Sequence, residues 1–245
     1  MNHYVILISA ILPIIILLFY IFFRKDKKQP EPTNLLIKAF LYGVISLFLS
    51  LCMSIPLGEI GAYPEEITTF TGAISTAFFG AAIPEEIAKF FMLWLLLRKN
   101  PYFDEKMDGI VYAVFVSLGF AALENIFYLF DNIDDFVAVG IIRALFAVPG
   151  HFCFGVLMGY YYSLMKFYPQ VTVRTKAMAL GAPIIAHGLY DAILMSMGTI
   201  PILLAFVLMV VFIVFCYKMW KFASLRIKEH LLRDYIDSGN KSYSE

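Results

Sequence analysis

The fold of this chain is decided by residues 70–97, which read FTGAISTAFFGAAIPEEIAKFFMLWLLL. The stretch is apolar enough to lie in a lipid bilayer, yet it contains the adjacent acids Glu85 and Glu86. An ionised carboxylate inside a membrane costs about 3 kcal/mol on insertion scales and more in simulations, so acids within a span are usually functional. A structural role would need one acid at most. The pair therefore predicts a functional site inside a membrane-spanning segment.

The composition of the whole chain predicts an all-α, polytopic membrane protein. Of the 245 residues, 61% are hydrophobic and only 16% are charged, and the mean hydropathy is +0.78, well outside the range of soluble domains. The net charge is zero and no basic tract is interleaved with aromatic residues, so we expect no nucleic-acid partner. We expect a single transmembrane domain over residues 1–223, with its catalytic core at about 70–197, and a cytoplasmic tail at 224–245.

About seven segments are long enough to span a bilayer, which takes roughly 20 apolar residues. They are Tyr4–Phe23, Leu35–Ile55, Phe70–Leu97, Gly109–Phe130, Phe136–Met165, Lys176–Met197 and Ile200–Lys218. The third and fifth exceed one bilayer thickness, so each must tilt, kink or project beyond the membrane. Pro84 and Pro149 are the expected kink points because proline removes a backbone donor.

Lysine and arginine predict the orientation of the chain in the cell membrane. The connections after the first, third and fifth segments and the tail after the seventh contain basic residues, whereas the other connections contain none. Because cytoplasmic loops are enriched in lysine and arginine, the N-terminus is predicted outside and the tail in the cytoplasm. The first segment ends in Phe-Phe-Arg-Lys rather than at a small-residue cleavage site, so we expect a retained span and not a signal peptide.

Several polar residues fall at similar depths when about 1.5 Å of rise per residue is counted from the nearest segment end. Glu85, Glu86, His151 and His187 lie near the middle of their segments. Four further polar residues lie nearer the outer face: Glu124, Asn125, Asp191 and Arg143. Charges that face lipid would be prohibitive, so we expect these groups to face one another across an interior polar cavity.

Two pairs of residues are spaced so that they share a helix face. Glu85 and Lys89 are four residues apart with the acid first, which is the favourable order for an ion pair. His187 and Asp191 have the same spacing, which suits an imidazole oriented by a carboxylate. Two adjacent carboxylates cannot both ionise cheaply in a low dielectric, so one is expected to be charged and the other to hold or share a proton. That state suits a general base.

Some of these residues also have structural interpretations. His151 taken alone could be a hydrogen-bonding contact between helices, and so could Glu124 with Asn125. Lys89 could extend toward the inner membrane surface, and Arg143 toward the acidic residues of the outer loop. The sequence leaves these alternatives open.

Glutamate and histidine at one depth suit three kinds of chemistry. A carboxylate can take a proton from water while histidine and asparagine stabilise the developing oxyanion, as hydrolysis of an amide requires. The same residue types can hold Zn2+, with His151, His187 and either Glu124 or Glu86 as ligands. Proton-coupled transporters also use such residues at the bilayer midplane. The His-Glu-x-x-His spacing is absent, so the spacing does not decide between them.

Four ordered motifs resemble the PrsW family of bacterial intramembrane proteases. They are Glu85-Glu86-Ile87-Ala88-Lys89-Phe90, Gly119-Phe120-Ala121-Ala122-Leu123-Glu124-Asn125, His151 followed by Gly155 and Gly159-Tyr160, and His187-Gly188-Leu189-Tyr190-Asp191. The resemblance covers about residues 78–191. It implies an endopeptidase of the superfamily that includes CAAX prenyl endopeptidases, bacteriocin-immunity proteins and the non-catalytic scaffold subunit of gamma-secretase. Both metal-dependent and glutamate-dependent mechanisms have been described for this superfamily.

The resemblance also implies a substrate class. The CAAX branch has Glu-Glu-x-x-x-Arg and ends its final motif in Asn, whereas here Lys89 comes one residue earlier and Asp191 takes the Asn position. This fits the PrsW branch and argues against a prenylated substrate. PrsW makes the first cut in a single-pass anti-sigma factor, which begins its destruction and releases a stress-response sigma factor. A bacterial origin follows from the same resemblance.

We therefore expect an intramembrane endopeptidase that hydrolyses a peptide bond of a membrane-tethered protein with a glutamate-activated water. A zinc-dependent version of the same protease, a proton-coupled transporter and a non-catalytic membrane scaffold are the alternatives. The expected catalytic residues are Glu85, Glu86, His151 and His187, supported by Lys89, Glu124, Asn125, Asp191 and Arg143.

Overall fold

The computed structural model describes residues 3–24, 30–168 and 170–241, with side chains except at 24 and 238–241, and these ranges are helical without any strand. The elements are α1 (His3–Arg24), α2 (Thr33–Glu59), α3 (Phe70–Ser75), η1 (Thr76–Ala82), α4 (Ile83–Leu97), α5 (Lys106–Asp131), α6 (Phe136–Ile142), η2 (Arg143–Ala147), α7 (Val148–Phe167), α8 (Val173–Ser196), η3 (Met197–Thr199) and α9 (Ile202–Lys241). Most of the first predicted basic connection, residues 25–29, lies outside the described ranges.

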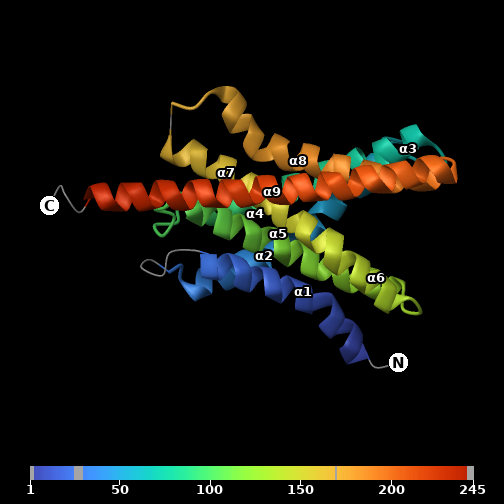
Figure 1. The fold of residues 1–245 in the computed structure, drawn as a ribbon, viewed down its shortest axis with the longest axis horizontal. Helices are drawn as coiled ribbons and strands as arrows, with labels where there is room; N and C mark the ends of the chain where they lie inside the picture. The colour runs from blue at the N-terminus through green and yellow to red at the C-terminus, as the bar shows by residue number, and fades with distance from the viewer. Residues whose placement is uncertain (1–2, 25–29, 169, 242–245) are drawn as a thin grey trace.

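The described elements form helical runs at all of the predicted transmembrane segments. Six runs are long and apolar enough to cross a membrane, judged by length and composition: α1, α2, α5, α6–η2–α7, α8–η3 and α9. The remaining run, α3–η1–α4, is helical from Phe70 to Leu97 and carries the two glutamates. Figure 1 shows the N- and C-termini at opposite ends of the bundle. The prediction of an all-α polytopic membrane protein is confirmed.

π-helical turns interrupt the two long runs just before the predicted kink prolines. η1 ends at Ala82, two residues before Pro84, and η2 ends at Ala147, two residues before Pro149. A proline has no backbone N–H and its ring clashes with the carbonyl four residues earlier, so a wider turn accommodates it. In both runs the π turn therefore sits immediately ahead of the polar residues of interest.

α5 is the central helix of the bundle. It is the most buried candidate span. In its apolar stretch of 18 residues 78% are buried, whereas the share in the other candidate spans is at most 39%. Glycines allow its close approach to two neighbours: a Cβ on Gly119 would meet the backbone carbonyl of Phe40 in α2, and a Cβ on Gly159 of α7 would meet that of Gly109. Small residues bring membrane helices together in this way. The helix that carries Glu124 is thus held rigidly between α2 and α7.

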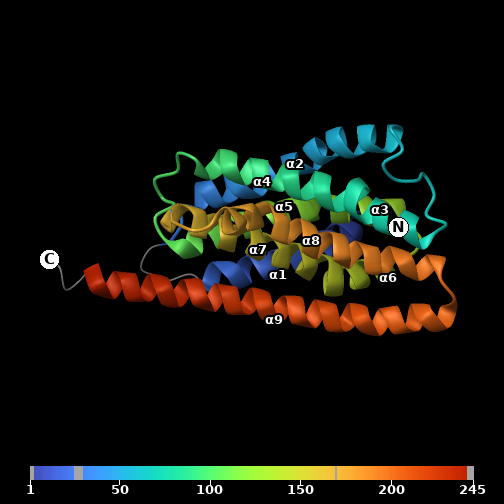
Figure 2. The same ribbon diagram turned by 90° about the horizontal axis from the view of Figure 1, so that it is seen from above.

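α9 lies along the outside of the bundle as one helix of 40 residues, about 60 Å long at 1.5 Å per residue. Figures 1 and 2 show it covering one face and continuing beyond the other helices at its C-terminal end. Its N-terminal half exposes a series of apolar side chains, as a lipid-facing helix does. The helix passes residue 223, the predicted end of the transmembrane domain, without a break.

The C-terminal part of α9 is attached to the ends of α5 and α7. The backbone N–H groups of Lys106 and Met107 donate to the Asp234 carboxylate at 2.9 and 2.8 Å, so α9 caps the first turn of α5. The Tyr160 hydroxyl of α7 donates to Glu229 at 3.1 Å. These bonds anchor the part of the chain that was predicted as a tail.

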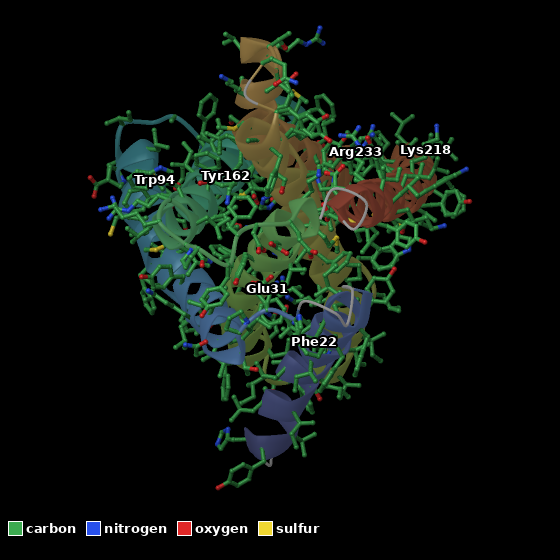
Figure 3. All side chains as sticks on the ribbon, turned by 90° about the vertical axis from the view of Figure 1, so that its left-hand side faces the viewer. Phe22, Glu31, Trp94, Tyr162, Lys218 and Arg233 are labelled. Carbon is green, nitrogen blue, oxygen red and sulfur yellow. The ribbon has the colours of Figure 1, made fainter. Side chains whose placement is uncertain are left out.

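Figure 3 views the bundle from this same end. Arg233 of α9 lies to one side of the view, where it pairs with Glu229, and Glu31 lies nearer the middle. The Tyr112 hydroxyl of α5 donates to the Glu31 carboxylate, which ties the segment before α2 to the central helix. This end of the bundle is therefore closed by polar contacts between helices.

Candidate active site

A cavity of about 490 Å³ lies between η1, α4, α5, α6, η2, α7, α8 and α9. Six of the predicted site residues line it: Glu85, Glu124, Arg143, His151, His187 and Asp191. The other three, Glu86, Lys89 and Asn125, are buried and do not line it. The structure thus brings all nine predicted residues into one region and separates those that face the cavity from those behind them.

Lys89 holds both glutamates of the pair. Its ammonium Nζ lies 3.1 Å from Glu85 Oε2 and 2.9 Å from Glu86 Oε1, and its side chain is fully buried. The predicted Glu85–Lys89 pair is therefore present, and Lys89 does not extend toward the membrane surface. Glu86 is also fully buried, and its Oε2 has no hydrogen-bond partner, whereas the Glu85 side chain is 13% exposed. The two acids thus occupy different environments.

His187 lies between two carboxylates. Its Nδ1 is 2.9 Å from Glu86 Oε1, and its Nε2 is 3.2 Å from Asp191 Oδ2 and 3.9 Å from Glu85 Oε2. The predicted His187–Asp191 contact is present. The ring is stacked on Phe154 with centroids 4.6 Å apart, which fixes its plane. A carboxylate at each ring nitrogen suits an imidazolium that donates to both sides.

His151 lies between a cation and a carboxylate. Its Nδ1 is 3.3 Å from Lys89 Nζ, and its Nε2 is 3.0 Å from Glu124 Oε2. An ammonium group has no acceptor, so Lys89 donates to Nδ1 and the ring proton is on Nε2, where it donates to Glu124. This arrangement fixes one tautomer of His151 and links α4, α7 and α5.

Arg143 binds residues of α5 rather than the acids of the outer loop. Its Nη2 lies 2.5 Å from Glu124 Oε2, its Nε donates to Asn125 Oδ1 at 2.6 Å, and its guanidinium covers the Tyr128 ring at 3.9 Å. The side-chain amide of Asn125 donates in turn to the carbonyl of Ala10 in α1 at 3.1 Å. Arg143 therefore belongs to the site, and Asn125 joins helices behind it.

The charges of the cluster do not balance with neutral histidines. The cluster contains four carboxylates, those of Glu85, Glu86, Glu124 and Asp191, and two cationic side chains, those of Lys89 and Arg143. The net charge is then −2. Unbalanced charge is costly in a low dielectric, so the site needs two protons or one divalent cation.

Within the described part of the chain, two groups of residues have donor atoms within 4.8 Å of one another, close enough to share a metal ion: Glu85, Glu86 and His187, and Glu85, Glu124 and His151. Each contains Glu85 and a single histidine, unlike the predicted zinc ligands, which combined both histidines. All members of the second group line the cavity. Carboxylate oxygen and imidazole nitrogen are ordinary zinc ligands. By donor type and by charge, the site fits a divalent metal.

Three residues near the site were missed by the sequence reasoning: Tyr128, Ser117 and Phe154. Tyr128 lies under Arg143, the Ser117 hydroxyl donates to the His151 carbonyl at 2.6 Å, and Phe154 stacks on His187. Helical spacing places all three on the same helix faces as predicted site residues. Tyr128 follows Glu124 by four positions, Ser117 precedes Glu124 by seven, and Phe154 follows His151 by three. A membrane helix has many such neighbours, so spacing alone could not select these.

A helical membrane bundle that holds carboxylates and imidazoles around a buried cavity defines a class of protein, one that carries out acid–base chemistry inside the bilayer. Residues 31–217 match the PrsW family of intramembrane metalloproteases. The chain is 35% identical to Protease PrsW of Clostridioides difficile over 85% of each chain. It is 37% identical to Protease PrsW of Geobacillus kaustophilus over 78% of this chain and 80% of that one, and 35% identical to Protease PrsW of Bacillus subtilis over 80% and 85%. No solved structure matches the chain.

The chain therefore belongs to the PrsW family of intramembrane metalloproteases. It is a multi-pass membrane hydrolase that acts on peptide bonds, and its relatives are bacterial. This confirms the predicted family and the predicted intramembrane protease activity.

Proposed function

We propose that this protein makes the first cut in a single-pass membrane protein of the anti-sigma-factor type, with Glu85 as the general base. The observation that carries the assignment is the different placement of the two glutamates: Glu85 lines the cavity, whereas Glu86 is fully enclosed. A general base must reach the proton it removes, so only the acid that faces the cavity can meet the water.

The reaction assigns a role to each group at the cavity. Glu85 takes a proton from water as the water oxygen bonds to the peptide carbonyl carbon. The C–N bond then breaks, and the proton passes from Glu85 to the leaving nitrogen. His187, as an imidazolium, stabilises the oxyanion of the intermediate by its positive charge, because the ring lines the cavity beside Glu85. Asp191 and Glu86 orient this ring from its two nitrogens.

The remaining groups set the electrostatics of the site. Lys89 is placed to keep Glu86 charged and to hold Glu85 in position. His151 is fixed between Lys89 and Glu124, with its Nε2 proton directed to Glu124, and it supplies a second imidazole at the cavity. Arg143 neutralises Glu124 at the outer side of the cavity. The site is therefore preorganised, and few side chains need to move during the reaction.

A divalent metal in this protein would take the place of the His151 Nε2 proton and be held by that nitrogen and Glu124, with the Glu85 carboxylate beside it as the base. When bound, Zn2+ supplies a Lewis acid for the carbonyl or for the attacking water. Metal analysis of the purified protein tests this assignment. The assignment is supported if the protein contains one zinc per chain and Glu124→Gln loses it. Glu59→Gln, at the exposed end of α2, is the control and should retain the zinc. Full activity in metal-free protein after chelation contradicts it.

We also propose that the acidic end of the bundle faces the outside of the cell, with the N-terminus there and the C-terminus in the cytoplasm. The loops 60–69, 132–135 and 197–201 contain no lysine or arginine, whereas the opposite end carries the basic connections. Glu124 and Arg143 lie toward the acidic end, so the cut falls in the outer half of the bilayer. Cysteine accessibility in intact cells tests this: Glu65→Cys is labelled by an impermeant reagent and Lys99→Cys is not.

The cleavage experiment uses a co-expressed single-pass anti-sigma factor with an epitope tag at each end. We expect the wild-type chain and Glu59→Gln to produce the cut fragments, and Glu85→Gln and His187→Ala to lower the yield at least a hundredfold with the protein still present in the membrane. Unchanged cleavage by both site variants would falsify the assignment. Gradient-driven uptake into proteoliposomes without any cut fragment would instead identify a transporter. If neither cleavage nor uptake is found, a non-catalytic scaffold is the remaining interpretation.

A further inference from the structure

One wall of the catalytic cavity is formed where η2 and α9 come into contact, which we call the η2–α9 seam. On the η2 side the cavity wall contains Phe146, and on the α9 side it contains Met209 and Phe212. The rings of Phe146 and Phe212 contact each other across the seam with centroids 5.5 Å apart. This aromatic pair lies between the two elements beside the cavity, and Phe212 also packs on Tyr190 of α8 with centroids 4.9 Å apart.

A second cavity continues the seam on the other side of this aromatic pair. It has a volume of about 360 Å³ and lies between η2, the start of α7 and α9, with Leu145 and Ile213 at its edges. Phe146 lines both cavities. Leu145 is 64% exposed and Ile213 50% exposed, so the rim of the seam is apolar and open to lipid. The two cavities together form an apolar path that runs from the lipid to the polar groups.

Two other helix contacts near the catalytic cavity are tight. Between α8 and η1 the helices are so close that a Cβ on Gly188 would meet the Phe78 ring. Between α5 and α1 the Asn125 side chain bonds to the Ala10 carbonyl. Parting these elements would break close backbone packing or a buried hydrogen bond, whereas parting the seam separates Phe146 from Phe212 and breaks apolar contacts alone, which lipid tails can replace.

The volume of the catalytic cavity limits what it can hold. One turn of α-helix, about 10 Å wide and 5.4 Å long, fills roughly 420 Å³. The cavity of about 490 Å³ therefore accommodates three or four residues and not an intact transmembrane helix. Beyond the charged groups its wall is apolar and flexible, with Leu194, Met195 and Met209. Methionine side chains adapt to ligands of irregular shape.

We propose that substrate enters through the η2–α9 seam as a single transmembrane segment, unwinds over about one turn, and places a large apolar side chain among Leu194, Met195 and Met209. Phe146 and Phe212 are the gate of this entrance, and they separate when the segment enters. The proposal rests on the proposed peptidase function, because it assumes that the polar groups at the base of the cavity act on the segment. It adds the route and the side-chain preference of the substrate.

Photo-crosslinking tests the route directly. p-Benzoylphenylalanine replaces Leu145 or Ile213 at the seam, or Phe48 or Leu51 on α2, which are also exposed apolar positions. Figure 2 shows α2 and α9 on opposite sides of the bundle. The probe is the tagged single-pass anti-sigma factor, co-expressed with chains that also carry Glu85→Gln so that the substrate remains bound. We expect adducts from both seam positions at a yield at least tenfold above the α2 positions. Equal yields at the two faces, or adducts from α2 alone, overturn the proposal.

A reversible crosslink tests whether the seam must open. In a chain with its three cysteines replaced, Leu145→Cys and Ile213→Cys are joined by a thiol-cleavable reagent, and mass spectrometry measures the joined fraction. We expect the crosslinked protein to cleave the substrate at least tenfold more slowly and to recover the original rate when the crosslink is reduced. The same reagent should leave the cleavage rate of each single-cysteine variant unchanged. Full cleavage by the joined protein overturns the proposal. If Glu85→Gln abolishes cleavage in the same assay while the crosslink has no effect, the entrance is wrong and the peptidase function stands.

Discussion

The replacement of Lys89 by methionine is the sharpest perturbation of the buried charge cluster. The ammonium lies 2.9 Å from Glu86 and 3.1 Å from Glu85, and the Lys89 and Glu86 side chains are fully buried. At an effective dielectric constant of 20 the attraction at 2.9 Å is about 6 kcal/mol. Part of this offsets desolvation, and removing one partner of a buried pair typically costs about 3–5 kcal/mol. We therefore expect Lys89→Met to lower the free energy of unfolding by about 3–5 kcal/mol.

A double-mutant cycle with Glu86→Gln isolates the pair. In the double variant Glu86 no longer carries a charge that needs Lys89, and only Glu85 loses its ammonium partner, so we expect at least about 1.5 kcal/mol of the loss to be recovered. Unfolding is followed in mixed micelles by titration with SDS, with Lys176→Met at the exposed start of α8 as the control. Additive losses in the double variant, or a loss below 1 kcal/mol for Lys89→Met, would refute the inference that Lys89 neutralises Glu86.

Three further predictions concern packing, capping and metal. Gly159→Ala places a methyl group against the Gly109 carbonyl and should lower the free energy of unfolding by about 1–3 kcal/mol. Gly181 has open space around it, so Gly181→Ala should be neutral or stabilising by up to about 1 kcal/mol. The midpoints of SDS unfolding measure both effects. Asp234→Ala removes the acceptor of the Lys106 and Met107 amides and should cost about 1–2 kcal/mol, with faster hydrogen exchange confined to the start of α5 as the readout. A metal held in the cavity should raise the unfolding temperature of the purified protein, and a chelator should reverse the shift; an unchanged temperature in both conditions contradicts a bound ion.

The sequence was sufficient to identify polar residues that the structure brings into one region, because the membrane makes intramembrane polar groups rare. In residues 70–97 only Glu85, Glu86 and Lys89 are charged, so depth and helical spacing identified them at once. The same argument predicted the transmembrane runs and the His187–Asp191 contact. Hydropathy and the 3.6-residue period are strong signals in a bilayer.

The sequence could not predict which glutamate faces the cavity. Residues 85 and 86 are adjacent, and helical neighbours point about 100° apart, so either could have been inward until the position of α8 was known. Arg143 was equally undetermined, because a long side chain near the membrane interface can reach either water or the interior. The positions of Glu124 and Tyr128 on α5 decide that the Arg143 side chain points to the interior.

The docking of α9 was also beyond the sequence reasoning. Asp234 lies well past the last apolar segment and looks like an ordinary acid of a charged tail. Its partners are backbone N–H groups of α5, which have no signature in the side-chain sequence. Long-range capping of this kind depends on where two distant elements meet.

The central claim is that Glu85 activates a water for peptide hydrolysis inside the membrane. The most direct measurement is cleavage of the single-pass anti-sigma factor in proteoliposomes that contain only purified protease and substrate, with the new ends identified by mass spectrometry. The account predicts a cut within the outer half of the substrate's transmembrane region by wild type and Glu59→Gln, and at least a hundredfold slower cleavage by Glu85→Gln with unchanged folding. Cleavage by Glu85→Gln at the wild-type rate would contradict it.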